Sequence, residues 1–203
     1  MTGFSMPSLR SVSDLASALA LSLLVAGSLF APESAQARDP RFGYAAMQAK
    51  DDDYVLEADV HFTLNERLED AVQRGVALYF VFEVEISRDR WYWFDEEIGR
   101  RIRTYRLSYH PLTRSYRLTL GSLHQNFDTL EEALQPVRRV RGWTIIPRDR
   151  LKAGSSYDVS LRFQLDTSQL PKPFQVTALG SSDWTLETDW LQWTFLATAP
   201  AVP

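Results

Sequence analysis

The feature that most constrains the fold is the alternation of apolar and other side chains between Val76 and Ser87. Successive side chains of an extended strand point to opposite faces, so six apolar residues share one face of this stretch. They are Val76, Leu78, Phe80, Phe82, Val84 and Ile86. Their burial is worth on the order of 10 kcal/mol before the entropy of folding is counted. A slip of one residue would bury Glu83 and Glu85 instead, so the register is fixed. We expect a central strand of an antiparallel sheet, with Glu83 and Glu85 on a face open to water.

Weaker alternation predicts strands along most of the remaining chain. These are residues 41–50, 54–64, 91–94, 101–110, 115–121, 143–147, 157–166 and 184–195. The first two are expected to form a hairpin around Asp51–Asp53, and 91–94, 101–110 and 115–121 a meander. The stretch from Leu170 to Phe174 contains two prolines, which cannot donate a backbone hydrogen bond. We therefore expect it to be extended, as an edge or a crossing loop.

Two short helices interrupt the strands. Asn65 is a helix-capping residue, and Gly75 is placed to close a helix over 66–74. A second helix is expected to begin after Asp128, with Glu131 completing a capping box and Gly142 ending the helix. Pro136 is expected to kink this helix or to end its regular part.

This pattern predicts a mainly β protein, an antiparallel two-sheet β-sandwich of immunoglobulin-like architecture with two short inserted helices. The alternative is a single curled sheet with both helices packed on one face.

The first 37 residues have the pattern of an export signal. Arg10 precedes an apolar run from Leu15 to Phe30, and Ala35–Ala37 is a small-residue cleavage site. The alternative is an uncleaved anchor, but 16 residues are fewer than the roughly 20 that a spanning helix needs. We expect a cleavable signal peptide (1–37), one sandwich domain (38–196) and a disordered C-terminal tail (197–203). The expected location is the periplasm or the medium, with no integral membrane segment after cleavage.

The amino-acid composition limits the kinds of binding site that the chain can form. The chain has no cysteine, so disulfides and thiolate metal sites are impossible. A net charge of −3 after cleavage gives no indication of nucleic-acid binding. The three histidines have no ligand spacing, so neither a metal nor a cofactor is expected.

The sequence contains only weak candidates for a catalytic site. Asp59 and His61 share a strand face, but the chain has no nucleophile motif of the Gly-x-Ser-x-Gly type. The neighbouring acids at Asp95–Glu97 and at Glu131 and Glu132 are poorly placed to flank a substrate. We expect the protein not to be an enzyme.

One candidate binding surface combines arginines with aromatic residues, which could bind an anionic partner or stack on sugar rings. Its residues are Trp91, Trp93, Arg101, Arg103 and Arg106. In the alternative interpretation these arginines pair with the abundant acids and the aromatic rings belong to the core.

A second candidate binding surface is the segment Leu170, Pro171, Lys172 and Pro173. A proline-rich extended segment can be recognised at little cost in ordering. In the alternative interpretation it is a rigid crossover that inserts Phe174 into the core.

The C-terminal third resembles a family of exported bacterial proteins, the domain of unknown function DUF4390. The resemblance rests on Leu165–Val176, which contains Leu-Pro-Lys-Pro-Phe-Gln, and on Ser182–Trp184 and Thr188–Trp190. Residues 116–121 and 128–134 resemble its middle portion. The family brings no catalytic or binding residues. Its genes tend to lie beside a membrane sensor histidine kinase of the nitrogen-regulation type, which implies a role in envelope signalling.

These observations predict a non-catalytic interaction module of the cell envelope. Its partner would be an envelope protein, and the resemblance suggests the periplasmic region of a sensor kinase. The alternative is a β-sandwich that binds a glycan or an anionic lipid. An enzyme ranks third.

Overall fold

The computed structural model describes residues 39–88 and 96–198, all within one compact unit. The predicted signal peptide, Trp91 and Trp93 lie outside the described residues, as does the end of the tail from 199 onwards.

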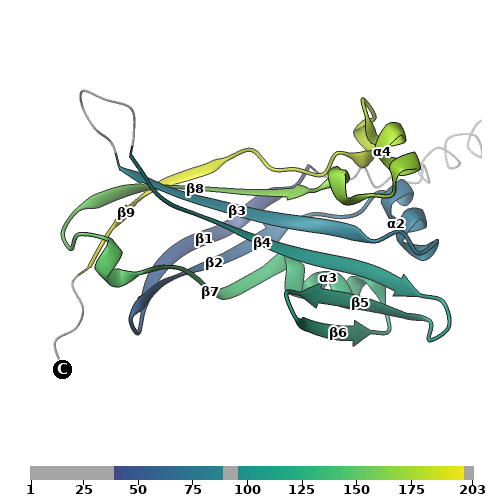
Figure 1. Ribbon diagram of the computed structural model, residues 1–203, viewed down its shortest axis with the longest axis horizontal. Coiled ribbons are helices and arrows are strands. Elements are labelled where there is room, and N and C mark those ends of the chain that lie inside the picture. Colours follow the sequence, from purple (N-terminus) through teal and green to yellow (C-terminus); the bar gives the residue numbers. More distant parts are fainter. Residues whose placement is uncertain (1–38, 89–95, 199–203) are drawn as a thin grey trace, which may run out of the picture. The chain divides into compact units, whose positions relative to one another are not determined.

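Two antiparallel sheets form the domain (Figure 1). The smaller sheet has the order β1-β2-β7, with β1 at Arg41–Lys50, β2 at Asp53–His61 and β7 at Arg139–Pro147. The larger sheet has the order β6-β5-β4-β3-β8-β9. Its strands are β3 (Leu78–Arg88), β4 (Glu96–His110), β5 (Ser115–Leu120), β6 (Leu123–Phe127), β8 (Ser156–Leu165) and β9 (Leu191–Leu196). The predicted two-sheet antiparallel sandwich is confirmed, and so is the hairpin of β1 and β2.

Strand β3 is central, as its alternation predicts. It pairs with β4 on one side and β8 on the other. Phe80 and Phe82 are fully buried beside Phe163 of β8. Phe62, which follows β2 in the opposite sheet, contacts Phe163 with ring centroids 4.8 Å apart. The core therefore lies between the sheets, where edge-on and tilted aromatic contacts add to the burial of apolar area.

The outer face of β3 differs from the prediction. Glu83 was expected to face water, but it is only 3% exposed. Arg100 of β4 and Arg162 of β8 both bond to its carboxylate from the flanking strands. Neighbouring strands place their side chains on the same face, so they can cover a polar group that one strand alone would leave wet.

The first helix forms as predicted. Helix α2 spans Glu66–Gln73, and the Asn65 side chain accepts a 3.0 Å hydrogen bond from the backbone nitrogen of Leu68. Gly75 follows with a φ of 88°, a conformation that glycine adopts without steric cost.

The second helix, α3 (Leu130–Arg138), differs at both ends. Its capping box uses Thr129 and Glu132, one residue later than the predicted pair. Pro136 lies inside the helix, which ends at Arg138 rather than at Gly142. From Arg139 the chain pairs with β2 instead, so tertiary pairing overrides the local glycine signal.

The proline-rich segment was wrongly predicted to be extended throughout. Lys172–Ala178 forms a third helix, α4, with Pro173 in its first turn. The missing N–H of a proline costs nothing there, because the first amides of a helix have no intrahelical partner. Leu170 and Pro171 alone remain extended.

The C-terminal segment is strand only from Leu191, because Ser182–Trp184 is a short 3₁₀ turn. Ala197 is buried, and its backbone bonds to Ser155 and Gly154. Thr198 accepts a hydrogen bond from the Tyr54 hydroxyl at 3.0 Å. The first two residues of the predicted tail thus pack on the domain.

Strand β6 was not anticipated, since Leu123–Phe127 is mostly exposed and has no clear alternation. Among the described residues, no helix has the length and apolar character needed to cross a membrane.

Candidate functional site

Two of the predicted arginines contact β7 of the smaller sheet, although Arg101 remains exposed and Arg103 partly exposed. Arg101 of β4 donates from Nε to the carbonyl of Ile145 in β7, at 3.0 Å. The guanidinium of Arg103 lies over the ring of Trp143, also in β7, 4.9 Å from its centroid. Strand β7 is the last strand of its sheet, so these two side chains cover its open edge.

Arg106 points to the other face of β4. Successive side chains of a strand alternate between its two faces, and Arg106 is an odd number of residues away from both Arg101 and Arg103. It is exposed and donates to the Tyr79 hydroxyl at 3.2 Å. The structure therefore does not bring the three arginines onto one surface. None of them forms an ion pair with another described residue.

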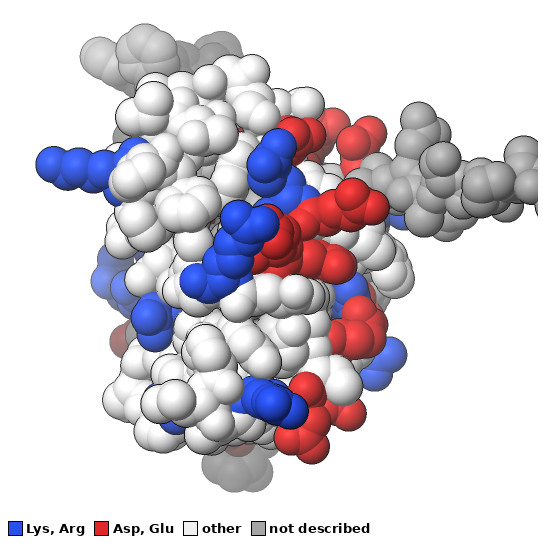
Figure 2. Space-filling view, turned by 90° about the vertical axis from the view of Figure 1, so that its right-hand side faces the viewer, with Lys and Arg blue, Asp and Glu red and all other residues white. Residues whose placement is uncertain are grey.

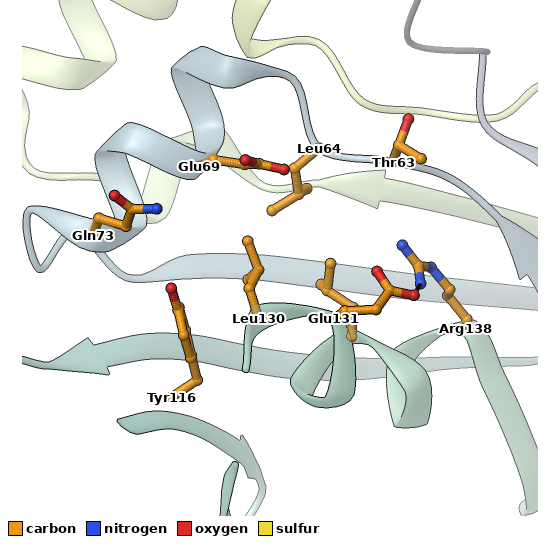
Figure 3. Close-up of a pocket in the computed structure, with 9 residues that line it drawn as sticks. Thr63, Leu64, Glu69, Gln73, Tyr116, Leu130, Glu131 and Arg138 are labelled. Atoms are coloured by element: carbon orange, nitrogen blue, oxygen red, sulfur yellow. Dashed lines mark hydrogen bonds and ion pairs between the residues drawn. The ribbon is translucent and has the colours of Figure 1, made fainter. Parts of the chain in front are cut away.

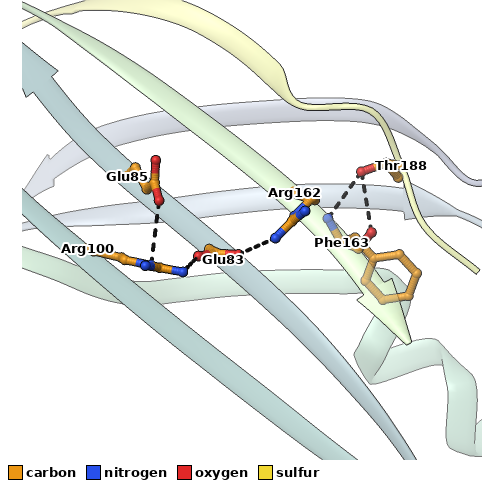
Figure 4. A network of polar contacts seen from close by, with 6 residues as sticks. All are labelled: Glu83, Glu85, Arg100, Arg162, Phe163 and Thr188. Carbon is orange, nitrogen blue, oxygen red and sulfur yellow. Dashed lines mark hydrogen bonds and ion pairs between the residues drawn. The ribbon is translucent and has the colours of Figure 1, made fainter. Parts of the chain in front are cut away.

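A polar network crosses the outer face of the six-stranded sheet (Figure 4). Glu83 of β3 accepts hydrogen bonds from Arg100 and from Arg162, the latter at 2.8 Å. Arg100 also approaches Glu85 at 3.5 Å. Arg162 lies 4.6 Å from the ring centroid of Trp190, which is half exposed beside β8. The network joins β4, β3 and β8 and ends on an aromatic ring.

The network keeps Glu83 ionised. Burial alone raises its pKa, but the hydrogen bonds and charges of Arg162 and Arg100 outweigh it and lower the pKa below 4.5. A carboxylate with both oxygens bonded to guanidinium groups is neither a proton donor nor a free base at neutral pH. The arrangement is that of a structural ion-pair cluster.

Thr188 supports the same sheet from its edge (Figure 4). Its side-chain oxygen accepts from the backbone nitrogen of Phe163 at 3.1 Å, and its own nitrogen donates to the Phe163 carbonyl at 2.9 Å. The segment before β9 is thereby fixed to β8.

A pocket of about 300 Å³ lies between α2, α3 and β5 (Figure 3). Its lining comprises Thr63, Leu64, Glu69, Gln73, Tyr116, Leu130, Glu131, Leu134 and Arg138. Leucines and the Tyr116 ring supply apolar surface, and carboxylate, amide and guanidinium groups surround it. This volume is at the lower end for pockets that hold small molecules.

The charged groups of this pocket are partly paired with one another. Arg138 forms an ion pair with Glu131 and donates from Nε to the Phe62 carbonyl at 3.1 Å. Burial raises the pKa of Tyr116, with Tyr109 and Glu69 adding to the effect and a hydrogen bond with Gln73 opposing it. Tyr116 is therefore a neutral phenol that can exchange hydrogen bonds with a ligand. No local sequence pattern predicts this pocket, because its lining comes from α2 and the residues before it, from β5 and from α3, which only the fold brings together.

The second predicted segment lies at the start of α4. Leu170 is buried, whereas Pro171, Lys172 and Pro173 are exposed. The inner side of α4 packs through Phe174 on Trp184, with ring centroids 5.7 Å apart.

The outer side of α4 is apolar as well. Val176 is 71% exposed and Leu179, just after the helix, is 82% exposed. Figure 2 shows this end of the domain, where the upper part is mostly uncharged and basic and acidic groups intermingle below it. We call Pro173, Val176 and Leu179 the α4 patch.

Asp59 and His61, which share a face of β2, contact other residues instead of forming a catalytic pair. Asp59 bonds to Arg141 at 2.5 Å, and the His61 ring occupies the space beside Gly43 where a side chain would clash. No cluster of three metal-ligating residues occurs in residues 39–88 and 96–198.

Comparison with known proteins identifies one family. No curated protein and no solved structure matches the chain. A family model, described as "Domain of unknown function (DUF4390)", matches residues 37–194. This range includes the smaller sheet, the larger sheet as far as Thr194 of β9, the polar network, the pocket and α4. The chain therefore belongs to the DUF4390 family.

Proposed function

We propose that the protein is a non-catalytic interaction module of the cell envelope, which binds another envelope protein through the α4 patch. The observation that carries the proposal is the solvent exposure of Val176 in α4 and of Leu179 directly after it. Exposed apolar residues grouped on one element are typical of protein contact sites.

Export is part of the proposal. Arg10, the apolar run to Phe30 and the Ala35–Ala37 site together have the order of a cleavable leader. The absence of cysteine from the whole sequence is compatible with an oxidising compartment, since no thiol is left to cross-link. The proposed location is the periplasm or the medium.

The ion pairs formed by two glutamates support the proposal that the protein is not an enzyme. Glu83 is neutralised by two arginines, and Glu131 by Arg138. Ion pairs of this kind fix strands and helices in place.

The chemistry of α4 narrows the partner. Apolar side chains occupy its outer side, and Lys172 provides a cation at its first turn. We therefore propose a partner that presents apolar side chains next to an acidic group. The gene neighbourhood that the family resemblance implies makes the extracytoplasmic region of a sensor histidine kinase the first partner to test.

The experiment measures binding of the exported protein to that purified kinase region by calorimetry. Val176→Asp together with Leu179→Asp should weaken binding at least about tenfold, because two buried apolar contacts are replaced by charges. Leu112→Asp with Leu123→Asp, also highly exposed apolar residues, is the matched control and should bind like wild type. Equal binding by the α4 variant, or none by wild type, would contradict the proposal.

A second candidate function is ligand binding, the glycan alternative of the sequence analysis, and the pocket between α2 and α3 favours it. Glu131 is paired with Arg138, so the wall keeps the negative charge of Glu69, and we propose a neutral polyhydroxyl ligand such as a glycan rather than an anionic lipid. A glycan array probed with wild type and with Leu134→Trp, which fills the pocket, tests this. Signals that the tryptophan leaves unchanged would contradict it.

A further inference from the structure

Within the described residues the two sheets end in four edge strands, and β9 is the one for which these residues provide no protection. An unpaired strand edge presents free N–H and C=O groups, and stable proteins normally blunt it with charges, prolines, bulges or covering side chains. The sequence of β9 is Leu-Gln-Trp-Thr-Phe-Leu, with no charged residue, proline or glycine. Its pairing with β8 shows no register shift.

The other three edges each carry such a device. Strand β7 is covered by Arg101 and Arg103. Strand β1 has a register shift next to Gly43 and a cation at each end. Strand β6 is only five residues long and mostly polar.

The inward-facing side chains of β9 are apolar and incompletely covered. Leu191, Trp193 and Phe195 face the smaller sheet, where the Phe195 ring meets Tyr54 edge-on at 5.1 Å. Trp193 and Phe195 are only half-buried, and Leu196 on the outer face is 57% exposed. No described residue pairs with the free side of β9.

We propose that β9 pairs antiparallel with β9 of a second copy, joining the two larger sheets into one continuous sheet across a two-fold axis. The argument for a second copy is self-complementarity. With the axis at Trp193 or at Thr194, inward apolar residues face inward apolar residues, and outward residues face outward ones. No like charges meet, because the strand has none. This surface is separate from the α4 patch, so the inference stands apart from the proposed function.

The first experiment is sedimentation equilibrium of the exported protein over ~1 to ~100 µM, where a dimer is expected. Gln192→Lys with Thr194→Lys places cations on the outward face and should weaken association at least about 100-fold, because like charges then face each other across the axis. Leu123→Lys with Gln125→Lys on β6 is the matched control and should remain dimeric. A monomeric wild type, or a β9 variant that stays dimeric, would overturn the proposal.

A charge-swap test protects against a misfolded variant. Gln192→Glu with Thr194→Glu should be monomeric alone, but should form a 1:1 heterodimer when mixed with the lysine variant. Mixing that restores no association, while circular dichroism shows both variants folded, would also overturn the proposal.

Because the chain has no cysteine, single cysteines locate the axis. Trp193→Cys or Thr194→Cys, whichever lies on the two-fold axis, should oxidise to a cross-linked dimer, since only there do equivalent Cα atoms come within the ~4.4 to ~6.8 Å of a disulfide. Ser160→Cys on the neighbouring strand should stay monomeric in the same assay. Cross-linking at Ser160 but at neither β9 position would contradict the pairing.

Discussion

The edge strands β7 and β9 belong to the same sandwich but differ in how other side chains cover them. At β7, Arg101 of β4 donates a hydrogen bond to the carbonyl of Ile145. Arg103 of β4 lies over the indole ring of Trp143. At β9 the strand is uncharged and its aromatic residues are half-buried. The difference shows that long cationic side chains placed by another strand protect β7, and that β9 has no comparable protection from a described residue. At β9 the missing cover is consistent with an intermolecular contact.

The largest effect is expected at β3, an interior strand of the larger sheet. Glu83→Ala leaves Arg100 and Arg162 without their buried counter-ion, and we expect the free energy of unfolding to fall by about 3 kcal/mol. Urea denaturation measures it. Association through β9 should be retained in folded protein, because the network lies on β3 and not at the edge. A loss below about 0.5 kcal/mol would show that the cluster does not hold β4 to β8.

The pH dependence of stability tests the same cluster. Since the folded-state pKa of Glu83 is lowered below 4.5, its contribution is complete above about pH 4.5 and is lost as the pH falls through the lowered value. The stability difference between wild type and Glu83→Gln should therefore shrink on acidification. A difference that is constant from about pH 7 to about pH 3 would contradict the assignment.

Removing the cover of β7 is expected to have the next largest effect. Arg101→Ala with Arg103→Ala removes a charge-assisted hydrogen bond and a cation–π contact, so stability should fall by about 2 kcal/mol. The variant should also associate more strongly than wild type, because β7 then resembles β9. Arg106→Ala is the control and should change stability by less than about 0.5 kcal/mol. Unchanged association would mean that the arginines stabilise β7 without guarding it.

The smallest effect concerns the residue next to β9. Trp190→Ala removes the ring that Arg162 lies over, at a cost of about 0.5 to 1 kcal/mol. Chemical denaturation measures this change, with Leu196→Ala as the comparison. If the loss exceeds that of Glu83→Ala, then Trp190 and not the carboxylate holds Arg162.

The sequence predicted the architecture better than the sites. Alternation placed β3 at the centre of its sheet, and Asn65 and Gly75 marked the ends of α2, because both signals are local. The arginine surface was expected from nearness in sequence, but β4 sends Arg101 and Arg103 to one face and Arg106 to the other. This separation follows from the alternation of side chains along a strand, so the sequence was sufficient to predict it.

Other features could not be read from local patterns. The burial of Glu83 depends on which strands flank β3, and the pocket depends on where α2 and α3 pack. The helix at Lys172–Ala178 was hidden by its prolines, which are unfavourable in a helix interior but not in a first turn.

By itself, then, the sequence determined a cysteine-free β-sandwich with β3 in its interior, because periodicity of two sorts side chains between core and solvent. The tertiary structure alone decided which edge is covered and which is open. Edge protection depends on the strand order, and strand order brings together residues, such as Arg101 and Ile145, that are far apart in the chain.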